Sequence, residues 1–156
     1  MYYSKIIYED VVNGDGLRTT LFVSGCTLNC KGCHNKQSQN FRFGELYTEQ
    51  TKNEIIESLN NEYVDGLSIS GGDPLEPKNF KDVLELCKSV KEVYPSKTIW
   101  VWTGRTIEEI LDTDANVVLQ YIDVLIDGRY VEEYKNSSLL YRGSSNQRVL
   151  RKGSDF

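Results

Sequence analysis

The hydrophobic and polar positions of this chain follow two periods, and the shorter period marks strands. Four segments rich in β-branched and aromatic residues end at glycine or at a polar turn, a pattern typical of strands. Residues 1–17 alternate only loosely and finish in a tight turn at residues 13–16, and residues 147–150 could form a final strand. The four predicted strands are Thr19–Ser24, Leu67–Ser70, Thr98–Trp102 and Val124–Ile126.

The longer period marks helices, in which apolar residues recur every three or four positions. Thr48 and Thr106 can cap two of them, because a threonine hydroxyl accepts a hydrogen bond from a free backbone N–H of the first turn. Residues 36–44 and the chain after Val131 are expected to be irregular. The predicted helices are Thr48 to about Glu62 (burying Ile55, Ile56 and Leu59), Asn79–Val93 (burying Phe80, Val83, Leu84, Cys87 and Val90) and Thr106–Leu111, with another short element at Val117–Tyr121.

The predicted strands and helices alternate along the chain, as they do in βαβ units around a parallel sheet. A complete eight-unit barrel takes about 250 residues, whereas this chain has 156. We therefore expect an α/β fold, specifically a partial (open) TIM-type barrel of parallel strands with outer helices. No linker or internal repeat interrupts the pattern, so residues 1–156 are expected to form a single domain.

Composition and charge limit which kinds of partner the protein can have and in which cellular compartment it is expected. The net charge of -5 argues against nucleic acid as the main partner, because nucleic-acid binders need a basic surface. The N-terminus lacks the apolar core of a secretory signal, and no apolar run approaches the length of a membrane span. We therefore expect a cytoplasmic protein with neither a membrane nor a nucleic-acid partner. In that compartment clustered cysteines are more often metal ligands or redox groups than disulfides.

Three of the four cysteines lie in one short loop, directly after the first predicted strand. Cys26, Cys30 and Cys33 can either pair oxidatively or share a metal, and three ligands leave one coordination position open for a substrate. A structural zinc site would need a fourth ligand, which only His34 or Cys87 could provide. His34 adjoins the last loop cysteine and Cys87 lies on the apolar side of a helix, so the spacing favours an iron–sulfur cluster over zinc or simple buried thiols.

Three further motifs follow the other predicted strands, at Gly71–Pro74, Trp102–Arg105 and Asp127–Arg129. Because parallel strands end at the same edge of a sheet, these turns and the cysteine loop should meet on one rim, where α/β proteins bind ligands. The two glycines could let a ligand approach the backbone, and a carbonyl or the Asp73 carboxylate could receive an ammonium group. For Thr103 and Asp127, a role in helix capping or in a surface ion pair explains their presence as well as contact with a ligand does.

These residues carry a resemblance to a known family. Three cysteines spaced Cys26-x-x-x-Cys30-x-x-Cys33, with Gly71–Pro74 ending the next strand, resemble the radical S-adenosylmethionine enzymes. Within that superfamily, residues 12–18, 22–26 and 33–35 are similar to the small activases of glycyl-radical enzymes. Two positions depart from the pattern: Asp15 stands where a proline is common, and Gly32 stands where many members have an aromatic residue.

The resemblance implies a function, two cofactors and two partners. The three loop cysteines would hold a [4Fe-4S] cluster, and reductive cleavage of S-adenosylmethionine would give a 5'-deoxyadenosyl radical, with no catalytic side chain beyond the cluster and cofactor. That radical would generate a glycyl radical on the large subunit of anaerobic ribonucleoside-triphosphate reductase, and a low-potential donor such as flavodoxin would supply electrons. The residues expected to contact S-adenosylmethionine are Gly32, Cys33, His34, Gly71, Gly72, Asp73, Pro74, Thr103 and Asp127.

Two other functions stay open at this point. The chain could be a radical enzyme acting on a small metabolite, similar to 7-carboxy-7-deazaguanine synthase. It could also be a non-enzymatic module that binds zinc or carries an iron–sulfur cluster. A macromolecular substrate would distinguish the activase from the first alternative, and the metal content would distinguish it from a zinc module.

Overall fold

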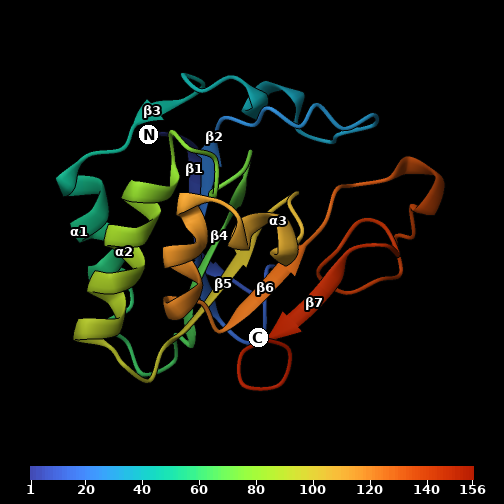
Figure 1. Cartoon of the computed structure of the whole chain (residues 1–156). Coiled ribbons are helices and arrows are strands. Elements are labelled where there is room, and N and C mark those ends of the chain that lie inside the picture. Colours follow the sequence, from blue (N-terminus) through green and yellow to red (C-terminus); the bar gives the residue numbers. More distant parts are fainter.

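A seven-stranded sheet forms the centre of the molecule (Figure 1), with the strand order β3-β1-β2-β4-β5-β6-β7. The structure is a computed structural model that describes all residues 1–156. The four inner strands β2, β4, β5 and β6 run parallel, whereas β1, β3 and β7 are antiparallel to their neighbours and leave the sheet open at both edges. The strands are β1 (Tyr2–Asp10), β2 (Arg18–Ser24), β3 (Glu45–Leu46), β4 (Gly66–Gly71), β5 (Thr98–Trp102), β6 (Val124–Asp127) and β7 (Arg148–Arg151).

Helices cover one face of the sheet, where α1, α2 and the 3-10 helix η2 lie side by side (Figure 1). Thr48 and Thr106 each form a capping box at the start of α1 and α3, as their sequence positions predicted. None of the helices has the length and apolar character needed to cross a lipid bilayer. The helices are α1 (Glu49–Ser58), α2 (Phe80–Val93) and α3 (Ile107–Leu111), with 3-10 turns η1 (Lys36–Gln39), η2 (Asp114–Tyr121) and η3 (Glu132–Tyr134).

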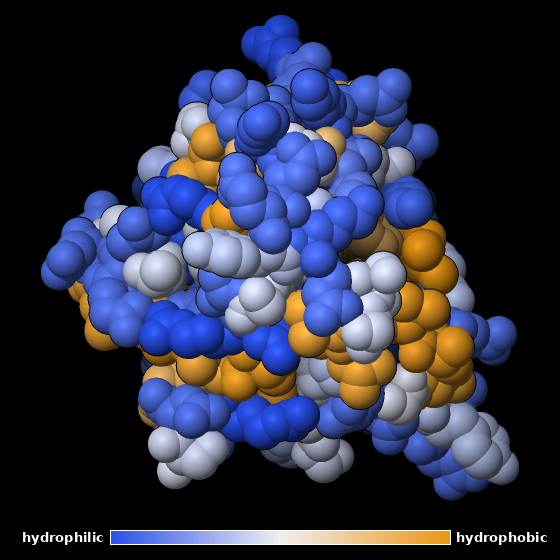
Figure 2. Space-filling model, turned by 90° about the vertical axis from the view of Figure 1, so that its right-hand side faces the viewer, coloured by the Kyte–Doolittle hydropathy of each residue, from blue (hydrophilic) through white to orange (hydrophobic).

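The two faces of the sheet have different coverings, because successive side chains of a strand point to opposite sides. Leu67 and Ile69 of β4 lie in the main core together with the apolar sides of α1 and α2. On the other face Trp100 heads a small cluster that packs against Tyr141 and Val149 from the C-terminal part of the chain. Figure 2 turns this side toward the viewer and shows hydrophobic side chains at mid-height between hydrophilic ones.

The four central strands and the three main helices confirm the sequence prediction, and the differences lie at the edges. Residues 2–10 form a strand that the loose alternation did not predict, and α1 ends at Ser58 instead of near Glu62. In α2 Leu84 is only partly buried, while Leu86 takes a fully buried place. The fold is therefore a mixed α/β sheet with a parallel centre, covered by helices on one face.

Candidate functional site

The four motif-bearing turns do meet at one edge of the sheet. The cysteine loop follows β2, and the turns beginning at Gly71, Thr103 and Asp127 follow or end β4, β5 and β6. All four strands are parallel, so these segments leave the sheet on the same side. A cavity of about 160 Å³ lies between them and is lined by residues from every one of the four turns. The prediction of a shared rim is confirmed.

Backbone hydrogen bonds fix the cysteine loop to the next turn. The N–H of Gly25 donates to the carbonyl of Ser38 (2.6 Å), and the N–H of Asp73 donates to the carbonyl of Gly25 (2.8 Å). A Cβ on Gly72 would lie 2.6 Å from the carbonyl oxygens of both Gly25 and Ser38, closer than carbon and oxygen can approach. Gly71 has φ +109°, and a Cβ there would meet the Val23 carbonyl at 2.3 Å. The glycine pair therefore permits tight packing of the loop against the strand end.

The three loop cysteines line the same small cavity, as a shared cluster requires. All three are partly exposed free thiols, whereas Cys87, on the buried side of α2, is completely enclosed in the core. Burial raises the pKa of the Cys26 thiol to about 11. No group of three or more His, Cys, Asp or Glu side chains is already arranged around one metal position. Binding of a cluster must therefore draw the thiols together and remove their protons, and the loop supplies three thiols for it.

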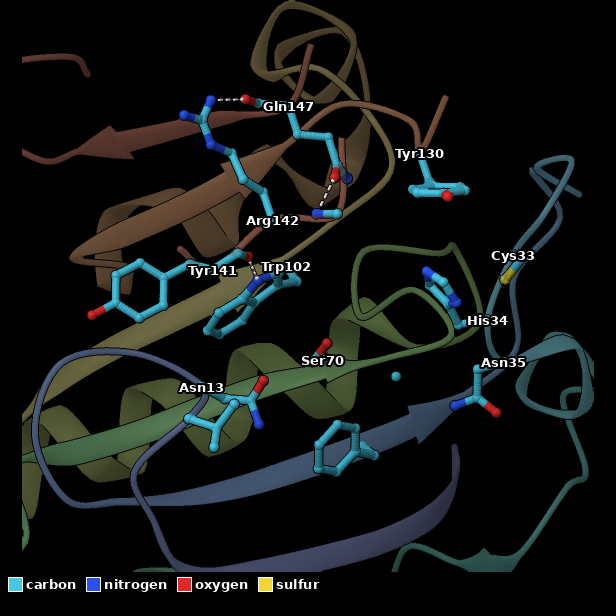
Figure 3. Close-up of a pocket in the computed structure, with 14 residues that line it drawn as sticks. Asn13, Cys33, His34, Asn35, Ser70, Trp102, Tyr130, Tyr141, Arg142 and Gln147 are labelled. Carbon is cyan, nitrogen blue, oxygen red and sulfur yellow. Dashed lines mark hydrogen bonds between the residues drawn. The ribbon is translucent and has the colours of Figure 1, made fainter. Parts of the chain in front are cut away.

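A larger cavity of about 530 Å³ adjoins the small one and opens on the face opposite the helices (Figure 3). Its volume is within the range of typical small-molecule sites, about 300–1,000 Å³. His34 lies in this wall with its ring centroid 5.2 Å from that of Tyr130. The residues that line both cavities are Cys33, Ser70, Gly71, Trp102, Tyr130 and Gln147. One continuous site thus extends from the cysteines across the sheet.

Asp73 connects the rim turns and has no exposed surface. Its carboxylate accepts hydrogen bonds from the Thr103 hydroxyl and the Gly104 N–H, both at 3.0 Å, and from Nη1 of Arg105 at 3.0 Å. Burial raises the pKa of this carboxyl group, and the Arg105 guanidinium acts in the opposite direction. The carboxylate is therefore occupied by protein donors. It holds the turns in place and does not face the cavity as a receptor for an ammonium group.

A second buried carboxylate, that of Asp127, ties the end of β6 to two other elements. It accepts the N–H of Ile107 at the start of α3 (2.8 Å) and Nε of Arg148 in β7 (2.9 Å). Among the other predicted contacts, Pro74 is buried and Gly32 borders Glu132, and neither lines either of the two cavities. Gly71, Gly72, Thr103, Cys33 and His34 do line them.

The C-terminal segment supplies cavity walls that were not among the predicted site residues. Gln147 holds this segment: its Oε1 accepts the N–H of Gly143 (2.9 Å; Figure 3), and its Nε2 donates to the Gly128 carbonyl (3.0 Å). The residue types at positions 142–148 carry no chemical signal that would reveal this position beside the cavities. The cavity residues outside the predicted set are Val12, Asn13, Phe22, Asn35, Ser70, Trp102, Tyr130, Tyr141, Arg142, Gly143 and Gln147, with Leu28, Gly104 and Gly128 in the smaller cavity.

Comparison with known proteins agrees with this site. A family described as a 4Fe-4S single cluster domain matches residues 12–150. A protein of Haemophilus influenzae is 46% identical over 97% of this chain and 98% of its own length, and one of Vibrio cholerae is 45% identical over the same shares. A protein of Escherichia coli K12 is 44% identical over 96% of this chain and 97% of its own length. All three are named anaerobic ribonucleoside-triphosphate reductase-activating protein.

Proposed function

This chain belongs to the family of anaerobic ribonucleoside-triphosphate reductase-activating proteins, and from that membership we propose how its site performs the activation. The protein is an iron–sulfur activase of the radical S-adenosylmethionine class, and its target is the anaerobic ribonucleoside-triphosphate reductase. The observation that carries this function is the position of the three loop thiols on one cavity at the ends of parallel strands. The family match to a 4Fe-4S single cluster domain supports it.

Cys26, Cys30 and Cys33 are the proposed ligands of the [4Fe-4S] cluster, and S-adenosylmethionine is the second cofactor. Bound together, these groups supply reductive cleavage of the sulfonium C–S bond and the radical that takes a hydrogen atom from a glycine of the reductase. The protein's own part is to bind, to orient and to exclude water. The packed glycines and the buried Asp73 help to orient the cofactors, because they fix the cysteine loop relative to β4 and β5.

Tyr130 is the proposed contact for the adenine ring. Gly32 provides no aromatic side chain beside the last loop cysteine, whereas Tyr130 lines both cavities. Gly143 packs against its ring, since a Cβ there would lie 3.1 Å from the ring carbon Cδ1. Three other large aromatic residues line the larger cavity. Trp102 donates its indole N–H to the Tyr141 carbonyl, Tyr141 donates its hydroxyl to Asp15, and Nζ of Lys5 lies 4.8 Å from the centre of the Phe22 ring. Stacking on an aromatic ring is a favourable arrangement for a nucleobase.

The architecture suits a macromolecular substrate. We take residues 1–156 as one domain in which the open sheet corresponds to part of a TIM-type barrel. The face without helices gives the large subunit of the reductase access to the cavity. A low-potential electron donor such as flavodoxin completes the reaction, in the cytoplasm.

Electron paramagnetic resonance tests this function directly. The protein with reconstituted cluster is incubated without oxygen with dithionite, S-adenosylmethionine and the large reductase subunit. A glycyl-radical doublet on the reductase is the expected result. Cleavage of S-adenosylmethionine without that doublet would favour a small-metabolite enzyme, and a colourless protein that binds zinc but no iron would favour a binding module.

A further inference from the structure

The segment that carries the cysteines is basic, although the whole chain is acidic. The protein has 23 acidic and 18 basic residues, yet residues 25–44 contain Lys31, Lys36 and Arg42 and neither Asp nor Glu. Lys78, from the turn before α2, extends this set. We call the surface formed by Lys31, Lys36, Arg42 and Lys78 the basic face.

The basic face consists of cations from the cysteine loop and from the two segments that pack against it. The N–H of Cys26 donates to the carbonyl of Gln39 (3.2 Å), which fixes η1 and its Lys36 against the loop. The ring of Phe41 covers Gly25, since a Cβ there would lie 2.1 Å from the ring, and Nζ of Lys78 lies 5.0 Å from the centre of that ring. Contacts from three segments therefore join these cations to the backbone that carries the thiols.

The four cations are exposed and have no carboxylate partner. None of them takes part in an ion pair, whereas Arg105, Arg129 and Arg148 near the cavities are all paired. Two acidic side chains contact the cysteine loop: Glu132 borders Gly32, and Glu76, which is buried and paired with Arg105, accepts the N–H of Thr27. The loop and η1 lie at the top of the molecule in Figure 1, and the same height in Figure 2 presents mainly hydrophilic side chains. Exposed, unpaired cations among hydrophilic side chains suit a partner that docks through charge, and they do not suit a partner that docks through apolar contacts.

The proposed function requires such a site. One electron must enter for each cleavage of S-adenosylmethionine, and electron transfer slows steeply with distance from the cluster. The inner side of the cysteine loop faces the cavities, which the cofactor and the reductase glycine occupy. The outer side is the short route that stays open while both are bound.

We propose that the basic face docks an acidic one-electron carrier protein, which is oxidised by one electron as the cluster is reduced by one. This inference rests on the proposed function, and the complementary charges steer the encounter of two proteins that are both acidic overall. Docking on the outer side lets the reductase keep its place at the cavity mouth while electrons arrive.

The test compares three single charge reversals in the cluster-loaded protein. Lys36→Glu and Arg42→Glu change the basic face, and Lys88→Glu changes an exposed lysine of α2 that has no ion pair. The dissociation constant of flavodoxin, the acidic carrier used as probe, is measured by isothermal titration calorimetry at low and high salt. The glycyl radical on the reductase is measured once with reduced flavodoxin and once with dithionite.

We expect Lys36→Glu and Arg42→Glu to weaken flavodoxin binding about tenfold at low salt and to reduce its salt dependence, with no such change in Lys88→Glu. With dithionite all three variants should form as much glycyl radical as the unchanged protein. Unchanged flavodoxin affinity, or an equal loss in Lys88→Glu, would overturn the proposal. Less glycyl radical with dithionite in the two face variants than in Lys88→Glu would overturn it too, and would assign the surface to the reductase instead. Failure of the proposed function has a separate sign, the lack of a radical in the unchanged protein with dithionite.

Discussion

The four cysteines occupy two environments, and this difference predicts the effects of their substitution. Cys30 is a partly exposed loop thiol on the small cavity, whereas burial in the core raises the pKa of Cys87 to about 12 and keeps its thiol neutral. We expect Cys30→Ser to abolish stable assembly of the cluster. Cys87→Ser should retain the cluster and lower the free energy of unfolding by about 1–3 kcal/mol, because it buries a hydroxyl among apolar side chains.

Iron and sulfide analysis with the visible absorption spectrum measures assembly, and urea unfolding of the metal-free protein measures stability. A Cys87→Ser protein that folds but binds no cluster would show that the three loop cysteines are not a sufficient ligand set.

Two tyrosines of the C-terminal segment differ in a way that tests the adenine contact. Tyr130 lines both cavities, whereas Tyr134 is 56% exposed and lines neither. We expect Tyr130→Leu to raise the dissociation constant for S-adenosylmethionine by about tenfold, which corresponds to the loss of a stacking contact worth about 1–3 kcal/mol. Tyr134→Leu is the control and should leave it unchanged. Calorimetric titration of the cluster-loaded proteins measures both, and equal affinities for the two variants would refute the assignment.

Asp10 gives the turn before β2 a dependence on pH. Burial alone would raise the pKa of this carboxyl group, but hydrogen bonds from Asn13, Thr20 and the Val12 N–H outweigh it and hold the pKa below its usual range. A lowered folded-state pKa contributes stability above the unfolded-state value of about 4, and this stability is lost as the pH falls through the folded-state value.

We therefore expect Asp10→Asn to be less stable than the unchanged protein at pH 7 and to lose less stability on acidification. Urea unfolding at pH 7 and in the acid range compares it with Glu62→Gln, an exposed position without a hydrogen-bond partner. If the free energy of unfolding fell equally with pH in Asp10→Asn and in the unchanged protein, the prediction would be contradicted.

Sequence spacing was sufficient to predict the loop cysteines as a set, but it could not assign the roles of the rim carboxylates. Asp73 and Asp127 were predicted to contact the cofactor, whereas the structure shows both fully buried and bound to protein donors. Which donors surround a carboxylate depends on how strands pair across the sheet, and periodicity along the chain carries no such information. For the same reason Tyr130 and Gln147 were not among the predicted contacts.

At the scale of elements, Arg105 is the side chain that joins three rim turns. It forms ion pairs with Asp73 (3.0 Å) and Glu76 (3.2 Å), and Glu76 in turn accepts the N–H of Thr27 in the cysteine loop (2.7 Å). Arg105→Gln would leave the Asp73 carboxylate buried without its cation. We expect this change to lower the free energy of unfolding by about 3 kcal/mol and to slow cluster assembly, because the cysteine loop loses its anchor.

Arg129→Gln is the matched control, since it breaks a half-exposed ion pair with Glu109 that is worth at most about 1 kcal/mol. Urea unfolding of the metal-free proteins and the rate of cluster reconstitution supply the two measurements. An Arg105→Gln protein as stable as the control would show that the rim network is not cooperative.

The elements that were predicted well are those with strong local patterns. The inner strands are apolar, and the helices repeat their apolar positions at the helical period, so their type and order follow from the sequence. The strand at residues 2–10 is half exposed and bulged, and its pairing with β2 depends on residues far along the chain. Strand β3 has only two residues, too few for any pattern. The edge formed by β1 and β3 could therefore not be foreseen, whereas the final strand expected at residues 147–150 is present as β7.

At the scale of the whole molecule, the two faces of the sheet have different roles. One face packs against the helices, and the other is available for contact with a partner protein. The helices cover one face, and the larger cavity opens on the other, between the turn before β2 and the C-terminal segment. Exposed apolar side chains stand in these two segments: Val11 and Val12 are 70% and 72% exposed, and Leu140 is 73% exposed. Because large exposed apolar side chains gathered beside a cavity indicate a protein contact, the reductase should cover them when its glycine enters.

Hydrogen–deuterium exchange of the cluster-loaded protein with S-adenosylmethionine, with and without the large reductase subunit, can locate that contact. We expect slower exchange in residues 11–13 and 130–147 when the subunit is present, because docking shields these backbone amides. Exchange in α1 and α2 should not change, so these helices are the internal control. Since an acidic carrier on the basic face would shield residues 36–42 instead, both footprints should occur together when both proteins are present. Protection of the helix layer by the reductase would refute this division of the surface.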